Sequence, residues 1–220
     1  MVAVNPLVIP GVYAPQEDTG LLAGALSEEP LAPGADVLDV GTGCGALALA
    51  AARRATRVTA VDVSWRAVCA TRWNALRAGL PVRVRHGNLF DPVDGRSFDL
   101  ILTNPPYVPA PAGDQVPRGT ARAWDAGGDG RLVVDRICRE APALLRPGGV
   151  LLMVHSALSD PDRTLAQLRA AGLKASVTRR RRIPFGPVLR SRKEWLRGRG
   201  LLSDDENSEE LVVVRAELPS

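Results

Sequence analysis

Hydrophobic and polar positions along the chain alternate between two kinds of segment. Short runs rich in aliphatic and β-branched residues predict buried strands, and longer segments with apolar residues every three or four positions predict helices. The expected strands cover residues 36–40, 57–61, 82–85, 98–103, 150–154, 174–181 and 211–217. The expected helices cover residues 17–28, 46–54, 65–78, 132–145 and 161–171. This alternation favours an α/β fold with a mainly parallel sheet and helices on both faces.

The alternation contains no internal repeat, so we expect one domain over residues 1–220. Residues 1–30 form a proline-containing lead-in followed by the first helix. Residues 108–130 are rich in Pro, Gly and Ala without periodicity, which is typical of a functional lid loop. Residues 183–209 form a basic and then acidic insertion between the last two expected strands.

Candidate polar groups follow each of the first four expected strands. The glycine-rich segment Gly41–Gly45 follows the first strand, Asp62 ends the second, Asn88 follows the third and Asn104 follows the fourth. In mainly parallel sheets, ligands bind beyond the carboxyl ends of the strands. We therefore expect these groups to converge on one ligand site.

The segment after the fourth strand reads Asn104, Pro105, Pro106, Tyr107. Two consecutive prolines fix φ and donate no backbone hydrogen bond, so the chain must leave the sheet here. The turn places the Asn104 amide, the two proline carbonyls and the Tyr107 ring in one small volume. Such a volume suits a planar amino group, whose two hydrogens the Asn104 Oδ1 and the Pro105 carbonyl would accept while Tyr107 packs on its face.

The glycine loop itself is shared by nicotinamide, flavin and S-adenosylmethionine enzymes. Here glycines at 41, 43 and 45 give GxGxG, whereas dinucleotide enzymes more often use GxGxxG to seat a pyrophosphate. S-adenosylmethionine has no phosphate and carries an ammonium, which Asp39 just before the loop could attract. The spacing therefore favours S-adenosylmethionine.

Composition places the chain among ordinary globular proteins, with 45% hydrophobic and 24% charged residues. No apolar run approaches the roughly 18 residues that span a bilayer, and no basic and then apolar leader opens the chain. The three cysteines are far apart and neither histidine has a partner at metal-ligand spacing. We expect a cytoplasmic protein with no membrane association and no metal site.

The net charge of +4 is unevenly distributed. Between Arg179 and Arg199, nine Arg or Lys residues face one Glu, which gives +8 and leaves about −4 for the rest of the chain. This segment is either a solvated face beside the acidic run Asp204–Glu210 or a surface that contacts RNA, the ribosome or an acidic protein.

Taken together, these motifs resemble class I S-adenosylmethionine-dependent methyltransferases. More narrowly, they resemble the HemK-type enzymes that methylate glutamine at N5 in translation termination (release) factors. Residues 12–19, Val-Tyr-Ala-Pro-Gln-Glu-Asp-Thr, are similar to the lead-in of the short branch of that family, which lacks the N-terminal helical domain. Residues 124–131 look like its Gly-Gly-x-x-Gly-Arg segment.

The resemblance implies a Rossmann-like, seven-stranded sheet with an antiparallel terminal strand. It implies that Thr19 and Asp39 address the amino-acid end of S-adenosylmethionine, Asp62 its ribose, and Asn88 with Leu89 its adenine. The expected cofactor contacts are Thr19, Asp39, Gly41, Gly43, Gly45, Asp62, Asn88, Leu89 and Asn104. The expected catalytic residues are Asn104, Pro105, Pro106 and Tyr107. The eukaryotic members of the short branch need a small activating subunit, which is a possible partner here.

Alternatives remain open at this stage. An exocyclic amino group of RNA or DNA (adenine N6 or guanine N2) is also planar, and a protein lysine or a metabolite could be the acceptor. From another class, the chain could be a non-catalytic scaffold that binds S-adenosylmethionine and RNA. The family usually has a brief turn where residues 183–209 stand, so the acceptor depends on a segment that the resemblance does not cover. Among the tryptophans, we expect Trp65 and Trp73 to be packing residues and Trp124 and Trp195 to be better placed for substrate contact.

Overall fold

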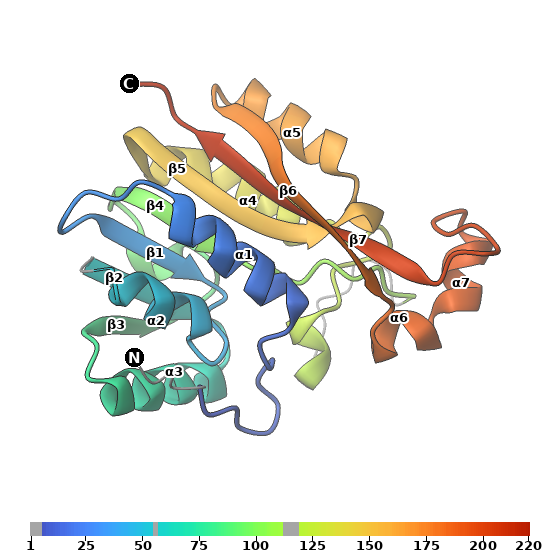
Figure 1. The fold of residues 1–220 in the computed structure, drawn as a ribbon, viewed down its shortest axis with the longest axis horizontal. Coiled ribbons are helices and arrows are strands. Elements are labelled where there is room, and N and C mark those ends of the chain that lie inside the picture. Colours follow the sequence, from blue (N-terminus) through green and yellow to red (C-terminus); the bar gives the residue numbers. More distant parts are fainter. Residues whose placement is uncertain (1–5, 55–56, 112–118) are drawn as a thin grey trace.

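The computed structural model describes residues 6–54, 57–111 and 119–220. Seven strands form one sheet in the order β3-β2-β1-β4-β5-β7-β6 (Figure 1). The strands are β1 (Asp36–Val40), β2 (Arg57–Asp62), β3 (Val82–His86), β4 (Phe98–Thr103), β5 (Leu145–Ser156), β6 (Lys174–Pro184) and β7 (Ser208–Glu217). The first five are parallel, and β7 is antiparallel to both β5 and β6. The predicted fold class is confirmed.

Helices cover both faces of this sheet. They are α1 (Glu17–Glu28), α2 (Ala46–Ala52), α3 (Trp65–Ala78), α4 (Val134–Glu140), α5 (Pro161–Ala170), α6 (Pro187–Ser191) and α7 (Lys193–Gly198). Four short 3₁₀ helices, Asp91–Val93, Gly119–Ala123, Ala141–Leu144 and Ala157–Ser159, complete the described secondary structure. In Figure 1, α1 and α2 lie in front of the sheet and α4 lies behind it. Helix α1 packs against β5, β6 and β7, while α2 packs against β1 and β2.

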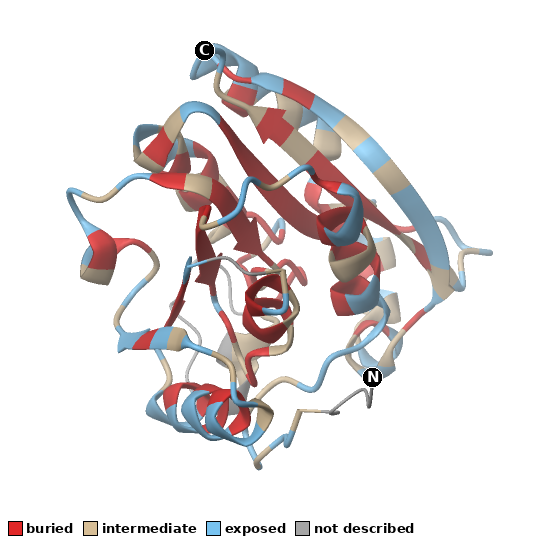
Figure 2. Cartoon of the chain, turned by 60° about the vertical axis from the view of Figure 1, so that its left-hand side comes forward, coloured by how far each residue is buried: buried red, intermediate tan, exposed pale blue. Residues whose placement is uncertain are grey.

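The core lies along the central strands. All five residues of β1 are buried, as are the last eight residues of β5. Figure 2 shows these strands as a continuous buried layer, with exposed residues concentrated on α3 and on the edge strand β6. Because parallel strands covered on both faces bury nearly every position, the short runs rich in aliphatic residues become the centre of the sheet, and Asp39 of β1 is buried among them.

Strand β5 begins earlier than the sequence predicts. The helix expected over residues 132–145 ends at Glu140, a 3₁₀ turn follows, and β5 starts at Leu145, five residues before the predicted strand. The Pro-Gly-Gly segment that was expected to separate helix from strand lies inside β5. Gly148 N donates to Leu218 O and Leu218 N donates to Gly149 O, so backbone pairing with the end of the chain extends the strand. Local turn residues are overridden here by a tertiary contact.

Helix α3 buries small residues and exposes its large ones. Ser64 caps the helix by accepting a hydrogen bond from Ala67 N, and Gly79 ends it in the left-handed conformation, as the sequence predicts. Trp65 and Trp73 are 61% and 52% exposed, so neither belongs to the core; the ring of Trp65 packs against that of His86, with the ring centroids 4.0 Å apart. The buried face consists of Ala67, Val68, Ala70, Thr71, Asn74 and Ala75. These short side chains allow α3 to approach the glycine loop closely.

The segment between the last two expected strands has regular secondary structure. Strand β6 continues to Pro184 and β7 starts at Ser208, so both run three residues beyond their predicted ends into residues 183–209. The remainder contains α6 and α7, whose apolar side chains pack onto the main core.

Candidate active site

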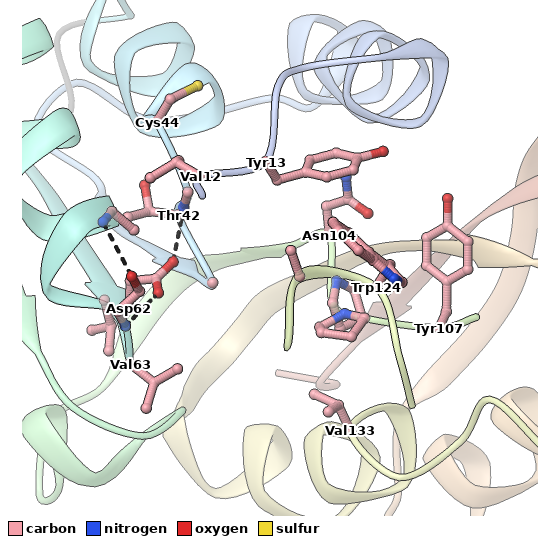
Figure 3. A pocket seen from close by; sticks show the side chains of 18 of the residues that line it. Val12, Tyr13, Thr42, Cys44, Asp62, Val63, Asn104, Tyr107, Trp124 and Val133 are labelled. Atoms are coloured by element: carbon pink, nitrogen blue, oxygen red, sulfur yellow. Dashed lines mark hydrogen bonds between the residues drawn. The ribbon is translucent and has the colours of Figure 1, made fainter. Parts of the chain in front are cut away.

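One cavity of about 900 Å³ opens along the carboxyl ends of the parallel strands. Figure 3 shows Thr42, Asp62 and Val63 at one end of it and Asn104, Trp124 and Tyr107 at the other. Its volume is at the upper end of the range for small-molecule sites. The convergence that the sequence predicts therefore takes place, with a wall built from segments that follow β1, β2, β3 and β4.

The glycine loop forms one wall with its backbone. Gly41 and Gly43 line the cavity with φ values of +72° and +58°, a region that residues with a Cβ rarely adopt. Gly45 lies outside the cavity wall, although its φ is +87°. A Cβ at Gly45 would come within 2.9 Å of the Thr71 side chain on α3. Gly45 thus permits helix packing, whereas Gly41 and Gly43 open the backbone to a ligand.

Asp39 lies beneath this loop and does not line the cavity. It is fully buried, and its Oδ2 accepts hydrogen bonds from Thr42 Oγ1 at 2.7 Å and from Ala48 N at 3.0 Å. Burial raises the pKa of this carboxyl to about 7. The structure therefore places Asp39 where it joins the loop to the start of α2. An effect on a bound ammonium would have to pass through the loop.

Asp62 lies beside the glycine loop and is held by two backbone amides, one of them in the loop. Its Oδ2 accepts from Gly43 N at 2.9 Å and its Oδ1 accepts from Ser64 N at 2.8 Å (Figure 3). Burial raises the pKa of this carboxyl. A carboxylate fixed in this way retains lone pairs for the two hydroxyls of a ribose.

The wall beyond Asp62 is built from Asn88 and Leu89, which follow β3. Leu89 has a φ of +46°, which is rare for a residue with a branched side chain. Asn88 Oδ1 accepts from Arg136 on α4 at 3.4 Å. Both predicted adenine contacts therefore lie at the cavity, in a loop that its surroundings hold in an unusual conformation.

The end of the cavity at Asn104, where the sequence predicts the methyl acceptor, is organised by a chain of hydrogen bonds; we call it the acceptor end. Asn104 Nδ2 donates to Thr19 Oγ1 at 3.3 Å, and Thr19 Oγ1 donates to Asp18 Oδ1 at 3.2 Å. Asp18 can only accept, so Thr19 must direct its proton to Asp18 and offer its lone pair to the Asn104 amino group. The direction of these bonds leaves the Asn104 carbonyl oxygen available to accept a hydrogen bond from a ligand.

Asp18 is a site residue that the sequence did not single out. It is 3% exposed, and its Oδ2 accepts from the hydroxyls of Tyr13 at 2.8 Å and Tyr107 at 3.1 Å. Burial, followed by the negative charge of Asp18, raises the pKa of both phenols above their ordinary value. Glu209 of β7 is buried nearby, and burial raises its pKa to about 7. The acid of the Glu-Asp-Thr lead-in was the only sequence signal for this cluster.

The Tyr107 main chain is braced from behind by the segment around Gly130. Ser159 Oγ donates to the Tyr107 carbonyl at 2.7 Å. Gly130 has a φ of +74°, and a Cβ there would clash with the same carbonyl oxygen. The next residue, Arg131, is 2% exposed and donates to Asp160 O at 2.8 Å and Thr164 Oγ1 at 3.0 Å. The segment Gly127–Arg131 therefore supports the turn at Asn104–Tyr107, and none of its residues lines the cavity.

The remaining predicted site residues divide between cavity and surface. Pro105, Pro106, Tyr107 and Trp124 line the cavity, whereas Trp195 does not. In the part of the chain that the structure describes, no cluster of three or more His, Cys, Asp or Glu side chains is placed to hold a metal ion. No described helix is both long and apolar enough to cross a membrane. Residues 112–118 of the expected lid lie outside the described residues.

A glycine loop after β1, an acid at the end of β2 and Asn-Pro-Pro-Tyr at the end of β4, all around one cavity, define a class I S-adenosylmethionine-dependent methyltransferase. The described lining residues fit this cofactor, because they include the carboxylates of Asp18, Asp62 and Asp125 against the guanidiniums of Arg66 and Arg136, and Arg136 is paired with Glu140. A sulfonium and an ammonium suit such a wall better than a pyrophosphate does.

Comparison with known proteins agrees with the geometry. The family model for the methyltransferase small domain matches residues 7–117. A Methanocaldococcus jannaschii protein that is named as a protein N5-glutamine methyltransferase is 34% identical over 181 residues, covering 82% of this chain and 90% of that protein. The chain therefore belongs to the methyltransferase small domain family, and it is an S-adenosylmethionine-dependent N-methyltransferase.

Two further relatives mark the range of similarity. The release factor glutamine methyltransferase of Deinococcus radiodurans is 40% identical over 169 residues, which cover 74% of this chain and 57% of that enzyme. The chain thus spans little more than half of that relative. The solved E. cuniculi Mtq2-Trm112 complex, which methylates the eRF1 termination factor, has a chain that superposes with a TM-score of 0.67 at 24% identity. That match covers 96% of this chain and 99% of the other, and it shows a shared fold.

Proposed function

We propose that this protein transfers a methyl group from S-adenosylmethionine to the N5 amide nitrogen of a glutamine in a translation termination factor. The observation that carries the proposal is the Asp18-Thr19-Asn104 chain, because it fixes the Asn104 carbonyl oxygen as a hydrogen-bond acceptor at the end of the cavity. The named activities of the M. jannaschii and D. radiodurans relatives support a glutamine acceptor.

The cofactor half of the cavity would hold S-adenosylmethionine through the backbone of Gly41 and Gly43, the Asp62 carboxylate, and the loop of Asn88 and Leu89. The bound cofactor supplies a methyl group already activated by the positive sulfur. The chain's own residues therefore need to bind, orient and stabilise rather than activate the donor.

The acceptor half supplies that geometry. Asn104 Oδ1 and the Pro105 carbonyl accept the two N–H groups of the glutamine amide, and the Tyr107 ring packs on its plane. An amide nitrogen is a poor nucleophile because its lone pair is delocalised, and two fixed acceptors stabilise the positive charge that develops as resonance is lost. Holding the nitrogen in line with the methyl group contributes up to about 7–11 kcal/mol. The bond between the nitrogen and the methyl carbon forms as the bond between that carbon and the sulfur breaks, the sulfur is left as a neutral thioether, and the nitrogen releases one proton to solvent.

The test is to incubate the purified protein with labelled S-adenosylmethionine and a termination factor, then locate the label by mass spectrometry. We expect one methylated glutamine, and we expect Asn104→Ala to lose nearly all turnover while cofactor affinity changes by less than about threefold. Unchanged turnover by Asn104→Ala would show that the proposed acceptor contact is wrong. Label found only on RNA in a cell lysate would exclude the glutamine acceptor.

The charges of the basic segment favour a protein acceptor over a nucleic acid. Five of its nine cations form ion pairs within the chain, which neutralises much of the surface. They are Arg179 with Glu28, Arg180 with Glu210, Arg181 with Glu17, Arg192 with Asp125, and Arg197 with Asp204. A solvated face with internal pairing accounts for most of the segment. Adding ribosomal RNA to the labelling reaction tests the weaker possibility of RNA contact.

A small activating subunit and a cytoplasmic location belong to the same proposal. A termination factor is met where translation takes place, which is the location that the sequence predicts. The E. cuniculi relative assembles with a small partner. Cys69, Trp73 and Leu76 form an exposed, mainly apolar stripe on α3 that offers a partner a surface, beside Trp65, which lines the cavity. Co-expression with a small partner should raise the yield of soluble protein, and Trp73→Glu should remove that gain.

A further inference from the structure

Helices α6 and α7 lie between β6 and β7 in the sequence and pack beside the acceptor end of the cavity. Phe185, Leu189, Leu196 and Leu202 are each less than a tenth exposed and belong to the main hydrophobic core. Because these side chains are packed, the two helices hold a defined position instead of forming a loose surface loop.

Arg192, the residue between α6 and α7, reaches from this element to the acceptor wall. Its Nη1 donates to the Pro109 carbonyl at 3.0 Å and lies 2.6 Å from Asp125 Oδ1. The side chains of Arg192 and Asp125 are only 18% and 13% exposed. Arg192 makes both contacts through one nitrogen, Nη1, and the rigid plane of the guanidinium fixes the direction of that nitrogen more closely than a flexible lysine stem fixes an ammonium.

The two groups that Arg192 holds belong to the two arms of the acceptor wall. Val108 N donates to Trp124 O at 2.8 Å and Ala126 N donates to Val108 O at 3.0 Å, so the arm after Tyr107 pairs with the arm around Trp124. Arg192 contacts the residue that follows Val108 on one arm and the residue that follows Trp124 on the other. Trp124 lines the cavity beside Asn104 (Figure 3).

Removing this guanidinium would leave a half-buried carboxylate and a carbonyl without their partner. Such groups regain water by moving outward, which separates the two arms. The other ion pairs of the segment lie elsewhere: Arg180 and Arg181 join the edge strand to Glu210 and Glu17 on more exposed surface. Arg192 is therefore the member of the basic segment whose charge is directed at the acceptor wall.

We propose that Arg192 is a positioning residue for the methyl acceptor: it fastens the arm carrying Trp124 to the turn after Tyr107, and thereby makes the α6–α7 element part of the acceptor pocket. This inference rests on the proposed function for its substrate, a glutamine-bearing protein segment. Its consequence is that residues 183–209 affect acceptor recognition by shaping the pocket, rather than by offering a diffuse positive surface.

The experiment compares Arg192→Ala and Arg192→Lys with Arg190→Ala, which removes one exposed positive charge two residues away. We expect Arg192→Ala to raise KM for the acceptor protein about tenfold or more, with kcat and cofactor affinity within about threefold of the parent. Arg192→Lys should restore part of the loss, because it keeps the positive charge but not the rigid planar group that directs Nη1 to Pro109 and Asp125. Arg190→Ala reports the cost of losing one charge alone and should change KM by no more than about twofold.

Amide hydrogen exchange tests the fastening without any acceptor. The amides of Val108 and Ala126 are hydrogen-bonded between the arms, and we expect them to exchange about tenfold faster in Arg192→Ala than in the parent or in Arg190→Ala. This measurement stands even if the acceptor is not a termination factor. Parental exchange at both amides would overturn the proposal, as would equal KM changes in Arg192→Ala and Arg190→Ala. If Arg192→Ala does not fold, the same comparisons made with Arg192→Lys decide between the outcomes.

Discussion

Thr19→Val is the sharpest test of how the acceptor pocket is set up. The valine keeps the approximate shape of threonine but removes the hydroxyl that accepts from Asn104 and donates to Asp18. Asp18 keeps the hydroxyls of Tyr13 and Tyr107, as well as the Thr19 backbone N–H at 2.6 Å. The buried carboxylate therefore remains satisfied, and the perturbation falls mainly on the orientation of the Asn104 amide.

The size of the effect follows from the two bonds that are lost. At 3.3 and 3.2 Å both are long, and each contributes about 0.5–1.5 kcal/mol. In Thr19→Val the transition state therefore loses about 1–3 kcal/mol of hydrogen-bonded positioning of the Asn104 carbonyl oxygen. Since 1.4 kcal/mol corresponds to a factor of ten, we expect kcat to fall about 5- to 150-fold.

The assay is methyl transfer to the acceptor protein at saturating S-adenosylmethionine, so that any loss of cofactor affinity does not enter kcat. Thr19→Ser is the matched control, because it keeps the hydroxyl, and it should stay within about threefold of the parent. Thermal unfolding of both variants checks that the fold is intact. Equal kcat values for Thr19→Val and Thr19→Ser would refute the role of the hydroxyl in orienting Asn104.

Three other predictions concern the brace, the core and the cofactor wall. Gly130→Ala should lower the free energy of unfolding in urea by about 2–4 kcal/mol, because alanine is strained in the left-handed region and its Cβ would clash with the Tyr107 carbonyl. Gly172→Ala is the control, since Gly172 has a φ of +90° and open space around it, and it should show the strain alone, about 1–2 kcal/mol. Equal losses in the two variants would contradict the clash. Burial lowers the pKa of His155 to about 4, so the unfolded chain binds its proton first and the His155 contribution to stability should fall by up to about 3 kcal/mol as pH drops from 6.5 to 4, whereas Asp39 and Glu209, whose pKa burial raises to about 7, act in the opposite direction. The stability of His155→Gln relative to the parent should therefore rise in melting curves recorded from pH 7.5 down to 4.5, and a constant difference would argue against it. Asp62→Ala should weaken S-adenosylmethionine binding about 30-fold or more, measured by calorimetry, and should change kcat at saturating cofactor much less. An unchanged affinity would show that Asp62 does not bind the cofactor.

Local sequence patterns were sufficient to predict an element where a residue type has one structural consequence. The short run Asp36–Val40, with three aliphatic residues among five, was predicted as a buried strand, and Gly79 was predicted to end the helix that Ser64 caps. The order of strands and glycine loop predicted the edge of the sheet where ligands bind, because parallel strands bring their carboxyl ends together. Asn104 at that edge was therefore found from sequence.

The same patterns misled where a residue's neighbours came from a distant segment. Gly148 and Gly149 were expected to end a helix, but pairing with Leu218 draws them into β5. Trp65 and Trp73 were expected to pack, yet the small face of α3 is the one that fits beneath the glycine loop. Hydrophobicity alone does not say which of two possible faces has room to approach.

The sequence by itself determined the class of chemistry, because two local motifs carry it. The prolines of Asn104-Pro105-Pro106-Tyr107 force the chain to turn out of the sheet, and the glycines of GxGxG leave the backbone after the first strand open to a ligand. Only the tertiary structure decided how that chemistry is held in place. The orientation of Asn104 depends on two residues of α1, Asp18 and Thr19, and Thr19 lies 85 residues before Asn104 in the sequence. The acceptor wall depends on Arg192, 83 residues beyond its partner Pro109. Hydrogen-bond direction and the burial of a charge are properties of groups that meet only after folding, so no local pattern could specify them.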